Sequence, residues 1–213
     1  MRVKICGLTS LSDALAAVEA GADAIGFMFY ERSPRNLSLT VAAQIVRELP
    51  PFVARVGVFV DASEEFIRRA IVECALDTLQ FHGDESPEFC QKFSLKSYKA
   101  FRIRGAESLK DLPRYRTSGW LLDSFVPDKV GGTGAAFNWD LARQAKEFGR
   151  PIILAGGLTP ENVAEAVRRV QPFAVDVSSG VESKPGIKDH GKVRAFIQEV
   201  IRSAARIPSL TPD

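Results

Sequence analysis

Residues 151–180, PIILAGGLTPENVAEAVRRVQPFAVDVSSG, contain a complete strand–helix–strand unit. The apolar run 151–155 and the β-branched run 173–178 predict two strands, and the helical period over 160–170 predicts the helix between them, with Pro160 in its first turn. A strand that returns to the same sheet through a helix runs parallel to its predecessor with a right-handed connection. The unit therefore predicts a parallel sheet, with a glycine-containing turn after each strand.

The same alternation repeats about eight times along the chain, which allows about 27 residues per unit. The predicted strands are 2–6, 23–29, 53–60, 77–82, 97–103, 119–124, 151–155 and 173–178. The predicted helices are 11–20, 40–48, 63–75, 86–95, 107–116, 139–148, 160–170 and 190–204. A doubly wound sheet is the competitor, but it usually has fewer strands and a G-x-G-x-x-G turn after the first. We predict an α/β fold, a single-domain (β/α)8 TIM barrel over residues 1–204, with 205–213 as a frayed tail.

Composition and charge limit the classes of partner. Lys and Arg number 28 against 26 Asp and Glu, a net charge of +2 that gives no sign of binding to nucleic acid or membranes. No apolar stretch approaches the roughly 20 residues of a membrane span, and no signal-peptide core follows Met1, so we expect a cytoplasmic protein. With two histidines and three irregularly spaced cysteines, neither a metal centre nor a disulfide framework is expected; the cysteines are Cys6, Cys74 and Cys90.

Polar side chains are predicted to point into the barrel from four strands. Strand side chains alternate between faces, and the apolar alternates should face the helices. The polar residues that then face inward are Lys4, Cys6, Gln80, His82, Asp123, Asp176 and Ser178. Because unpaired charges inside a barrel cost several kcal/mol, and because the first and last strands become neighbours on closure, we predict that Lys4 pairs with Asp176.

Cys6 and Asp123 end their predicted strands at the face where such barrels carry their chemistry. Cys6 is either a small buried hydrophobe or a thiol whose pKa is lowered by helix N-termini. Asp123 is either a helix cap or an acid in a pocket, and the cap is disfavoured because no helix is predicted before residue 139. The intervening segment 127–134 contains Gly131-Gly132-Thr133-Gly134 and is predicted to close over a ligand.

Glycine turns follow the seventh and eighth strands. Each alone can be a tight turn, but together they favour a phosphate site, because backbone N–H groups and a helix N-terminus attract the anion; the residues are Gly156, Gly157, Ser178, Ser179 and Gly180. Arg35, in the loop after the second strand, is either solvated or a clamp for a carboxylate. His82 is either a satisfied inward histidine or a substrate contact, and Asp176 joins it among the candidates for substrate binding.

Several motifs in register resemble the phosphoribosylanthranilate isomerases of tryptophan biosynthesis. They run from about residue 2 to 203 and include KICGLT at 4–9, GADAIGF at 21–27, SPR at 33–35, LQFHG at 79–83, LDS at 122–124, GGTG at 131–134, AGGL at 155–158 and VDVSSGVE at 175–182. The resemblance implies an Amadori rearrangement, without a cofactor, of N-(5-phosphoribosyl)anthranilate to 1-(2-carboxyphenylamino)-1-deoxyribulose 5-phosphate.

By the same resemblance, Cys6 is the general base, Asp123 the general acid, and Arg35 the ligand of the anthranilate carboxylate, while the two glycine turns bind phosphate. These roles require Asp123 to hold a proton near neutral pH, although the ordinary pKa of Asp is near 4. They also require Cys6 to lose its proton there, although the ordinary pKa of Cys is near 8.5. The alternatives are another phosphosugar isomerase or epimerase on the same barrel, and a phosphate-ligand binding protein without catalysis. Monomer and homodimer both remain open, and the expected partner is a small phosphoribosyl substrate.

Overall fold

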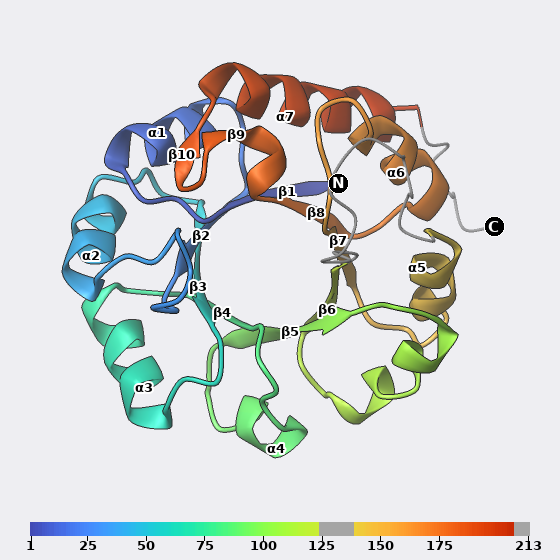
Figure 1. Cartoon of the computed structure of the whole chain (residues 1–213), viewed down its shortest axis with the longest axis horizontal. Coiled ribbons are helices and arrows are strands. Elements are labelled where there is room, and N and C mark those ends of the chain that lie inside the picture. The colour runs from blue at the N-terminus through green and yellow to red at the C-terminus, as the bar shows by residue number, and fades with distance from the viewer. Residues whose placement is uncertain (124–138, 207–213) are drawn as a thin grey trace.

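The structure, a computed structural model, describes residues 1–123 and 139–206. Within these residues, eight parallel strands form a closed barrel in the order β1 to β8, and each pairs with its neighbour in the sequence. Figure 1 looks down this ring, with the helices around its outside. The predicted (β/α)8 barrel is confirmed, and the pairing of β1 with β8 closes it.

The strands of the barrel are β1 (Arg2–Cys6), β2 (Ala24–Met28), β3 (Ala54–Phe59), β4 (Thr78–Phe81), β5 (Lys96–Arg102), β6 (Gly119–Asp123), β7 (Ile152–Ala155) and β8 (Ala174–Val177). The α-helices are α1 (Leu11–Glu19), α2 (Leu39–Arg47), α3 (Glu64–Glu73), α4 (Pro87–Cys90), α5 (Trp139–Lys146), α6 (Val163–Val170) and α7 (His190–Ala204). Each predicted strand is present, within two residues of its predicted ends.

The fourth and fifth predicted helices are wrong in extent. The helix predicted over 86–95 is only α4, which ends at Cys90 so that Phe89 and Phe93 both pack on Phe81, with ring centroids 6.1 and 5.7 Å away. The helix predicted over 107–116 is replaced by two 3₁₀ turns, η1 (Ala106–Leu109) and η2 (Leu112–Arg114). Pro113 explains this break, because proline has no N–H and disfavours helix at the preceding residue.

The last two units also differ locally from the prediction. Helix α6 begins at Val163 rather than at residue 160, because the Asn162 side chain holds the preceding turn, accepting from Thr159 N at 2.8 Å and donating to Gly157 O at 2.9 Å. After β8, a 3₁₀ turn η3 (Ser179–Val181) leads into a hairpin of β9 (Glu182–Lys184) and β10 (Ile187–Lys188) that was not predicted. Of the predicted tail, Ala205 and Arg206 form a turn and the remainder lies outside the described residues.

Two layers of side chains fill the fold. The outer layer, between strands and helices, contains the apolar alternates of each strand, among them Ile5, Leu79, Phe81, Leu122 and Val175. The inner layer, inside the barrel, is smaller and contains Cys6, Val56, Val58, Tyr98, Ala100, Leu121 and Ala155. The predicted alternation is therefore confirmed, and it directs the polar residues of β1, β4, β6 and β8 toward the barrel axis.

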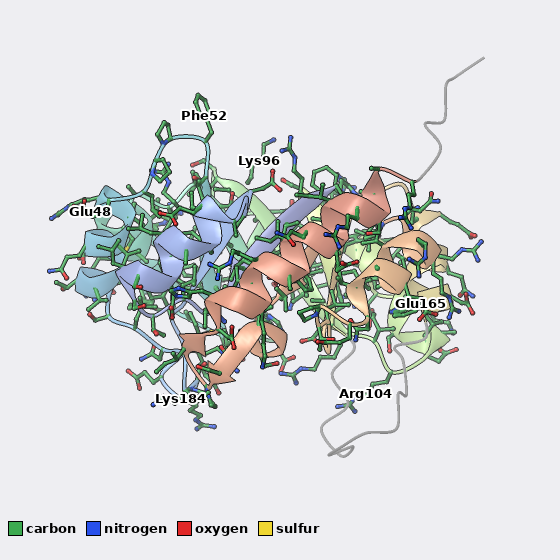
Figure 2. All side chains as sticks on the ribbon, turned by 90° about the horizontal axis from the view of Figure 1, so that it is seen from above. Glu48, Phe52, Lys96, Arg104, Glu165 and Lys184 are labelled. Carbon is green, nitrogen blue, oxygen red and sulfur yellow. The ribbon has the colours of Figure 1, made fainter. Side chains whose placement is uncertain are left out.

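Parallel closure gives the barrel two different ends. In Figure 2, Phe52 and Lys96, which lie at strand beginnings, occupy one face, whereas Arg104 and Lys184, which follow strands, occupy the opposite face. Cys6, Asp123 and the turns after β7 and β8 all belong to this second face, since each follows the carboxyl end of a strand. Within residues 1–123 and 139–206, no helix is long and apolar enough to cross a membrane.

Candidate active site

The predicted ion pair between Lys4 and Asp176 is confirmed. The Lys4 ammonium lies 3.0 and 2.9 Å from the two carboxylate oxygens, and the side chains are 6% and 7% exposed. Lys4 and Asp176 are direct partners in the register of β1 and β8, so closure of the barrel makes the pair. A buried charge without its partner is strongly unfavourable, so each side chain compensates the burial of the other inside the barrel.

Cys6 lies beside this pair, at the carboxyl end of β1. Gly26 of β2 provides its space, because a Cβ there would lie 2.8 Å from the Cys6 sulfur and 3.0 Å from Lys4 Cε. Burial raises the pKa of the Cys6 thiol, and the nearby Lys4 ammonium opposes this rise without cancelling it. Of the two alternatives for Cys6, the thiol with a lowered pKa is therefore not the one found.

Asp123 lies at the end of β6 and contacts the ring of His82. His82 Nε2 is 3.3 Å from Asp123 Oδ2, and the two side chains are 24% and 19% exposed. The other ring nitrogen of His82 is 2.8 Å from Gln80 Nε2, and Gln80 Oε1 accepts a hydrogen bond of 2.9 Å from the Tyr98 hydroxyl. His82 thus has a polar partner at each ring nitrogen, Gln80 at Nδ1 and Asp123 at Nε2.

Arg35 reaches the mouth of the barrel next to Cys6. Its Nε and Nη2 donate to the two Glu182 oxygens at 2.8 and 2.6 Å, a parallel pair of bonds that orients the guanidinium plane. Gly7, with φ of 72°, makes room for it, because a Cβ there would come within 2.5 Å of Arg35 Cδ. Glu182 also accepts from the fully buried Lys188 at 2.8 Å, and these three residues form one charged cluster.

The two predicted phosphate turns lie against each other. Gly156 and Gly157 adopt φ of 81° and 64°, which a residue with a side chain rarely adopts. A Cβ on Gly180 would overlap the Leu158 carbonyl oxygen, so only glycine permits this approach. Lys188 donates to the Ser178 carbonyl oxygen at 3.2 Å, which brings a positive charge next to the turn after β8.

The sequence did not identify Glu182, Lys188 and Tyr98 as part of this end of the barrel. Glu182 and Lys188 lie in the unpredicted hairpin β9–β10, and the contact of Glu182 with Arg35 joins residues 147 positions apart. Tyr98 could have been predicted from the sequence, because it alternates with outward-facing residues on β5. In the structure it is the partner of Gln80 in the register of β4 and β5. The predicted glycine loop at 127–134 lies outside the described residues.

The described part of the chain contains no group of three or more His, Cys, Asp or Glu side chains arranged to hold a metal ion. The charged atoms at the mouth are instead paired with one another, as Lys4 is with Asp176 and Arg35 with Glu182. The chemical groups that this arrangement offers are a thiol, a carboxyl with an adjacent imidazole, a guanidinium and two glycine turns.

Comparison with known proteins identifies the family. The family model described as N-(5'phosphoribosyl)anthranilate (PRA) isomerase matches residues 3–199. The N-(5'-phosphoribosyl)anthranilate isomerase of Geobacter sp. (strain M21) is 57% identical over 198 residues, which cover 93% of this chain and 97% of that protein. The match therefore spans almost the whole of both chains.

Solved structures agree in fold. The phosphoribosyl anthranilate isomerase of Thermotoga maritima has a TM-score of 0.90 at 45% identity, covering 95% of this chain and 99% of that one. A phosphoribosyl anthranilate isomerase in complex with reduced 1-(o-carboxyphenylamino)-1-deoxyribulose 5-phosphate has a TM-score of 0.87 at 43% identity, with coverage of 95% and 99%. Monomers made from the dimeric T. maritima enzyme have a TM-score of 0.85 at 41% identity, with coverage of 94% and 98%. The chain therefore belongs to the N-(5'-phosphoribosyl)anthranilate isomerase family.

Proposed function

We propose that Cys6 and Asp123 carry out the proton transfers of the isomerisation that this family catalyses in tryptophan biosynthesis. The observation that carries the proposal is that both side chains end strands at the same end of one closed barrel, on β1 and β6. Asp123 gives its proton to the furanose oxygen while the anthranilate nitrogen forms the C1′ Schiff base and the ring opens. The Cys6 thiolate then removes the proton from C2′ to give a neutral enolamine. In the last step C1′ gains a proton from the Cys6 thiol while the 2′-hydroxyl loses one to the Asp123 carboxylate, which gives the ketose and restores both groups.

The environment of Cys6 suits a strong base that is rarely ionised. Because burial raises the pKa of the Cys6 thiol, little thiolate exists at neutral pH, but a thiolate of high pKa accepts a proton more readily. Lys4 lies close enough to oppose the effect of burial, so it stabilises the ionised form. A positioned acid and a positioned base each contribute typically about 10² to 10⁴ in rate.

Arg35 and the two glycine turns are proposed to bind the two anionic ends of the substrate. Glu182 engages Nε and Nη2 of Arg35, so we assign the remaining Nη1 edge to the anthranilate carboxylate. The positive-φ glycines after β7 lie against the turn after β8, and glycine turns of this kind offer backbone N–H groups that suit a sugar phosphate. In this scheme His82 acts through its contact with Asp123, and Asp176 acts through its contact with Lys4. Neither side chain binds an anion of the substrate directly.

The test is the substitution Asp123→Asn, assayed by the loss of N-(5'-phosphoribosyl)anthranilate fluorescence. An amide of the same shape has no proton to give, so kcat should fall by about 10² to 10⁴ while KM changes little. Asp140→Asn is the matched control, because Asp140 is 56% exposed on the outer helix α5, where it pairs with Arg143 and Arg169. Near-normal turnover by Asp123→Asn would remove Asp123 as the acid.

We also propose that the protein forms a homodimer through the end of the barrel opposite the site. A mostly apolar cavity of about 590 Å³ opens there, lined by the beginnings of the strands and by Phe52 and Phe173. Phe52 is fully exposed and Phe173 is 58% exposed, and such apolar surface is typical of an interface. The description of the T. maritima relative as dimeric supports a second copy of this chain as the occupant.

Sedimentation of the wild-type protein and of Phe52→Asp tests the dimer. The wild type should sediment as a dimer and Phe52→Asp as a monomer, because a carboxylate in an apolar contact is strongly unfavourable. Val72→Asp is the control, since Val72 is 80% exposed on α3, away from this end. A monomeric wild type, or a dimeric Phe52→Asp protein, would contradict the proposal.

We also propose that the protein is cytoplasmic. All three cysteines are free and buried, and the proposed role of Cys6 requires a free thiol. Reducing compartments such as the cytoplasm keep thiols free, which supports this location.

A further inference from the structure

A chain of buried polar side chains connects the neighbourhood of Cys6 with Asp123 through the interior of the barrel. It consists of Lys4 on β1, Tyr98 on β5, Gln80 on β4 and His82 directly after β4. Gln80 is 1% exposed and Tyr98 is 6% exposed, so neither reaches the mouth where a substrate binds. Interior positions of such barrels are usually filled by branched aliphatic residues, so two polar side chains at these positions indicate a role other than packing.

The hydrogen of the Tyr98 hydroxyl has a defined direction. Burial raises the pKa of Tyr98, so the hydroxyl keeps its hydrogen. The hydroxyl donates this hydrogen to Gln80 Oε1, at 2.9 Å.

The direction of this hydrogen bond sets the orientation of the Gln80 amide, and the amide orientation in turn sets the tautomer of the His82 imidazole. With its carbonyl oxygen facing Tyr98, Gln80 presents its NH₂ group to His82 Nδ1 at 2.8 Å. An NH₂ group only donates, so Nδ1 must accept through its lone pair and cannot hold a proton in this arrangement. The proton of the neutral ring therefore lies on Nε2, 3.3 Å from Asp123 Oδ2.

We propose that Tyr98 and Gln80 are positioning residues that hold His82 in the Nε2–H tautomer, so that its N–H, rather than a lone pair, faces Asp123 Oδ2. This proposal rests on the proposed role of Asp123 as the general acid. Two residues that do not touch the substrate then decide the orientation of the group that does. In this arrangement His82 orients Asp123 and does not itself transfer a proton.

The tautomer is measured directly by ¹⁵N NMR of histidine-labelled protein at neutral pH. The chain contains only two histidines, and the spectrum of His190→Asn assigns the signals of His82. In the wild type, Nδ1 of His82 should show the signature of an unprotonated nitrogen and Nε2 that of a protonated one. A protonated Nδ1 in the wild type would overturn the proposal.

Two substitutions should change this tautomer in different ways. Gln80→Glu has the same shape but only accepts, so it should place a proton on Nδ1. Tyr98→Phe removes the hydroxyl that fixes the amide, so both tautomers should appear. Tyr115→Phe is the control, because Tyr115 donates to the Glu85 carbonyl outside this chain of contacts, and its spectrum should match the wild type.

Turnover separates positioning from binding and from folding. Tyr98→Phe should lower kcat by roughly three- to tenfold, the effect of losing about one hydrogen bond, while KM stays within about twofold. If Gln80→Glu does not fold, Tyr98→Phe alone decides, and a spectrum identical to the wild type then overturns the proposal. Failure of the catalytic role would instead appear as an active Asp123→Asn enzyme, and this outcome leaves the tautomer measurement unaffected.

Discussion

The same eight strands supply two layers that differ in composition. The outer layer is almost entirely apolar, and side chains such as Ile5, Leu79 and Val175 are completely buried between strands and helices. The inner layer has few large apolar groups and instead contains the buried Lys4–Asp176 pair, Gln80 and Tyr98. The difference shows that alternate residues of one strand can serve stability on one face and chemistry on the other.

The strongest test of this comparison breaks the inner ion pair. Lys4→Met leaves the buried Asp176 side chain without its ionic partner, so the free energy of unfolding should fall by about 3–5 kcal/mol. Urea unfolding followed by circular dichroism measures the change. The double substitution Lys4→Met with Asp176→Leu should recover much of this loss, and a single variant as stable as the wild type would show that the pair is unimportant.

A cavity in the outer layer should lower stability while sparing the chemistry. Ile67 of α3 is completely buried, and Ile67→Ala should lower the free energy of unfolding by about 3 kcal/mol. The value of kcat below the unfolding transition should remain that of the wild type. A large fall in kcat would contradict the separation of the two layers.

The pH dependence of alkylation tests the inner thiol. Only the thiolate reacts and burial raises the pKa of Cys6, so its rate of reaction with iodoacetamide should rise by up to about tenfold per pH unit through the ordinary thiol range near 8.5. The difference in rate between the wild type and Cys6→Ser isolates this thiol from Cys74 and Cys90. A rate that is already independent of pH above neutral pH would indicate a thiol of lowered pKa.

The outer thiols should affect stability rather than activity, by a smaller amount. Burial raises the pKa of Cys90 to about 12 and that of Cys74 to about 11. The unfolded chain ionises first, near pH 8.5, so each thiol lowers the free energy of unfolding as pH rises from there toward its folded value, by at most about 1.4 kcal/mol per unit. Unfolding curves at pH 8 and 9.5 should differ less for Cys90→Ala than for the wild type; equal differences would contradict this origin.

Much of the outer layer could be predicted from the sequence, because the period of apolar residues and the turn residues are local signals. The pairing of Lys4 with Asp176 was also predictable, since it follows from alternation together with closure of the ring. The cluster of Arg35, Glu182 and Lys188 was not, because it depends on a short hairpin without a strong strand pattern. The fourth and fifth helices were overpredicted where aromatic packing and Pro113 outweighed helical period.

The bond between Lys4 and Asp176 joins residues 172 positions apart, nearly the full length of the chain. Contacts so distant in sequence form late, because the cost of closing a long loop precedes any gain from the contact. During synthesis, the first strand emerges from the ribosome long before the strand that neutralises its lysine. A partly translated chain thus exposes an open sheet edge and lacks a finished catalytic centre, so activity should appear only after the eighth strand has been released.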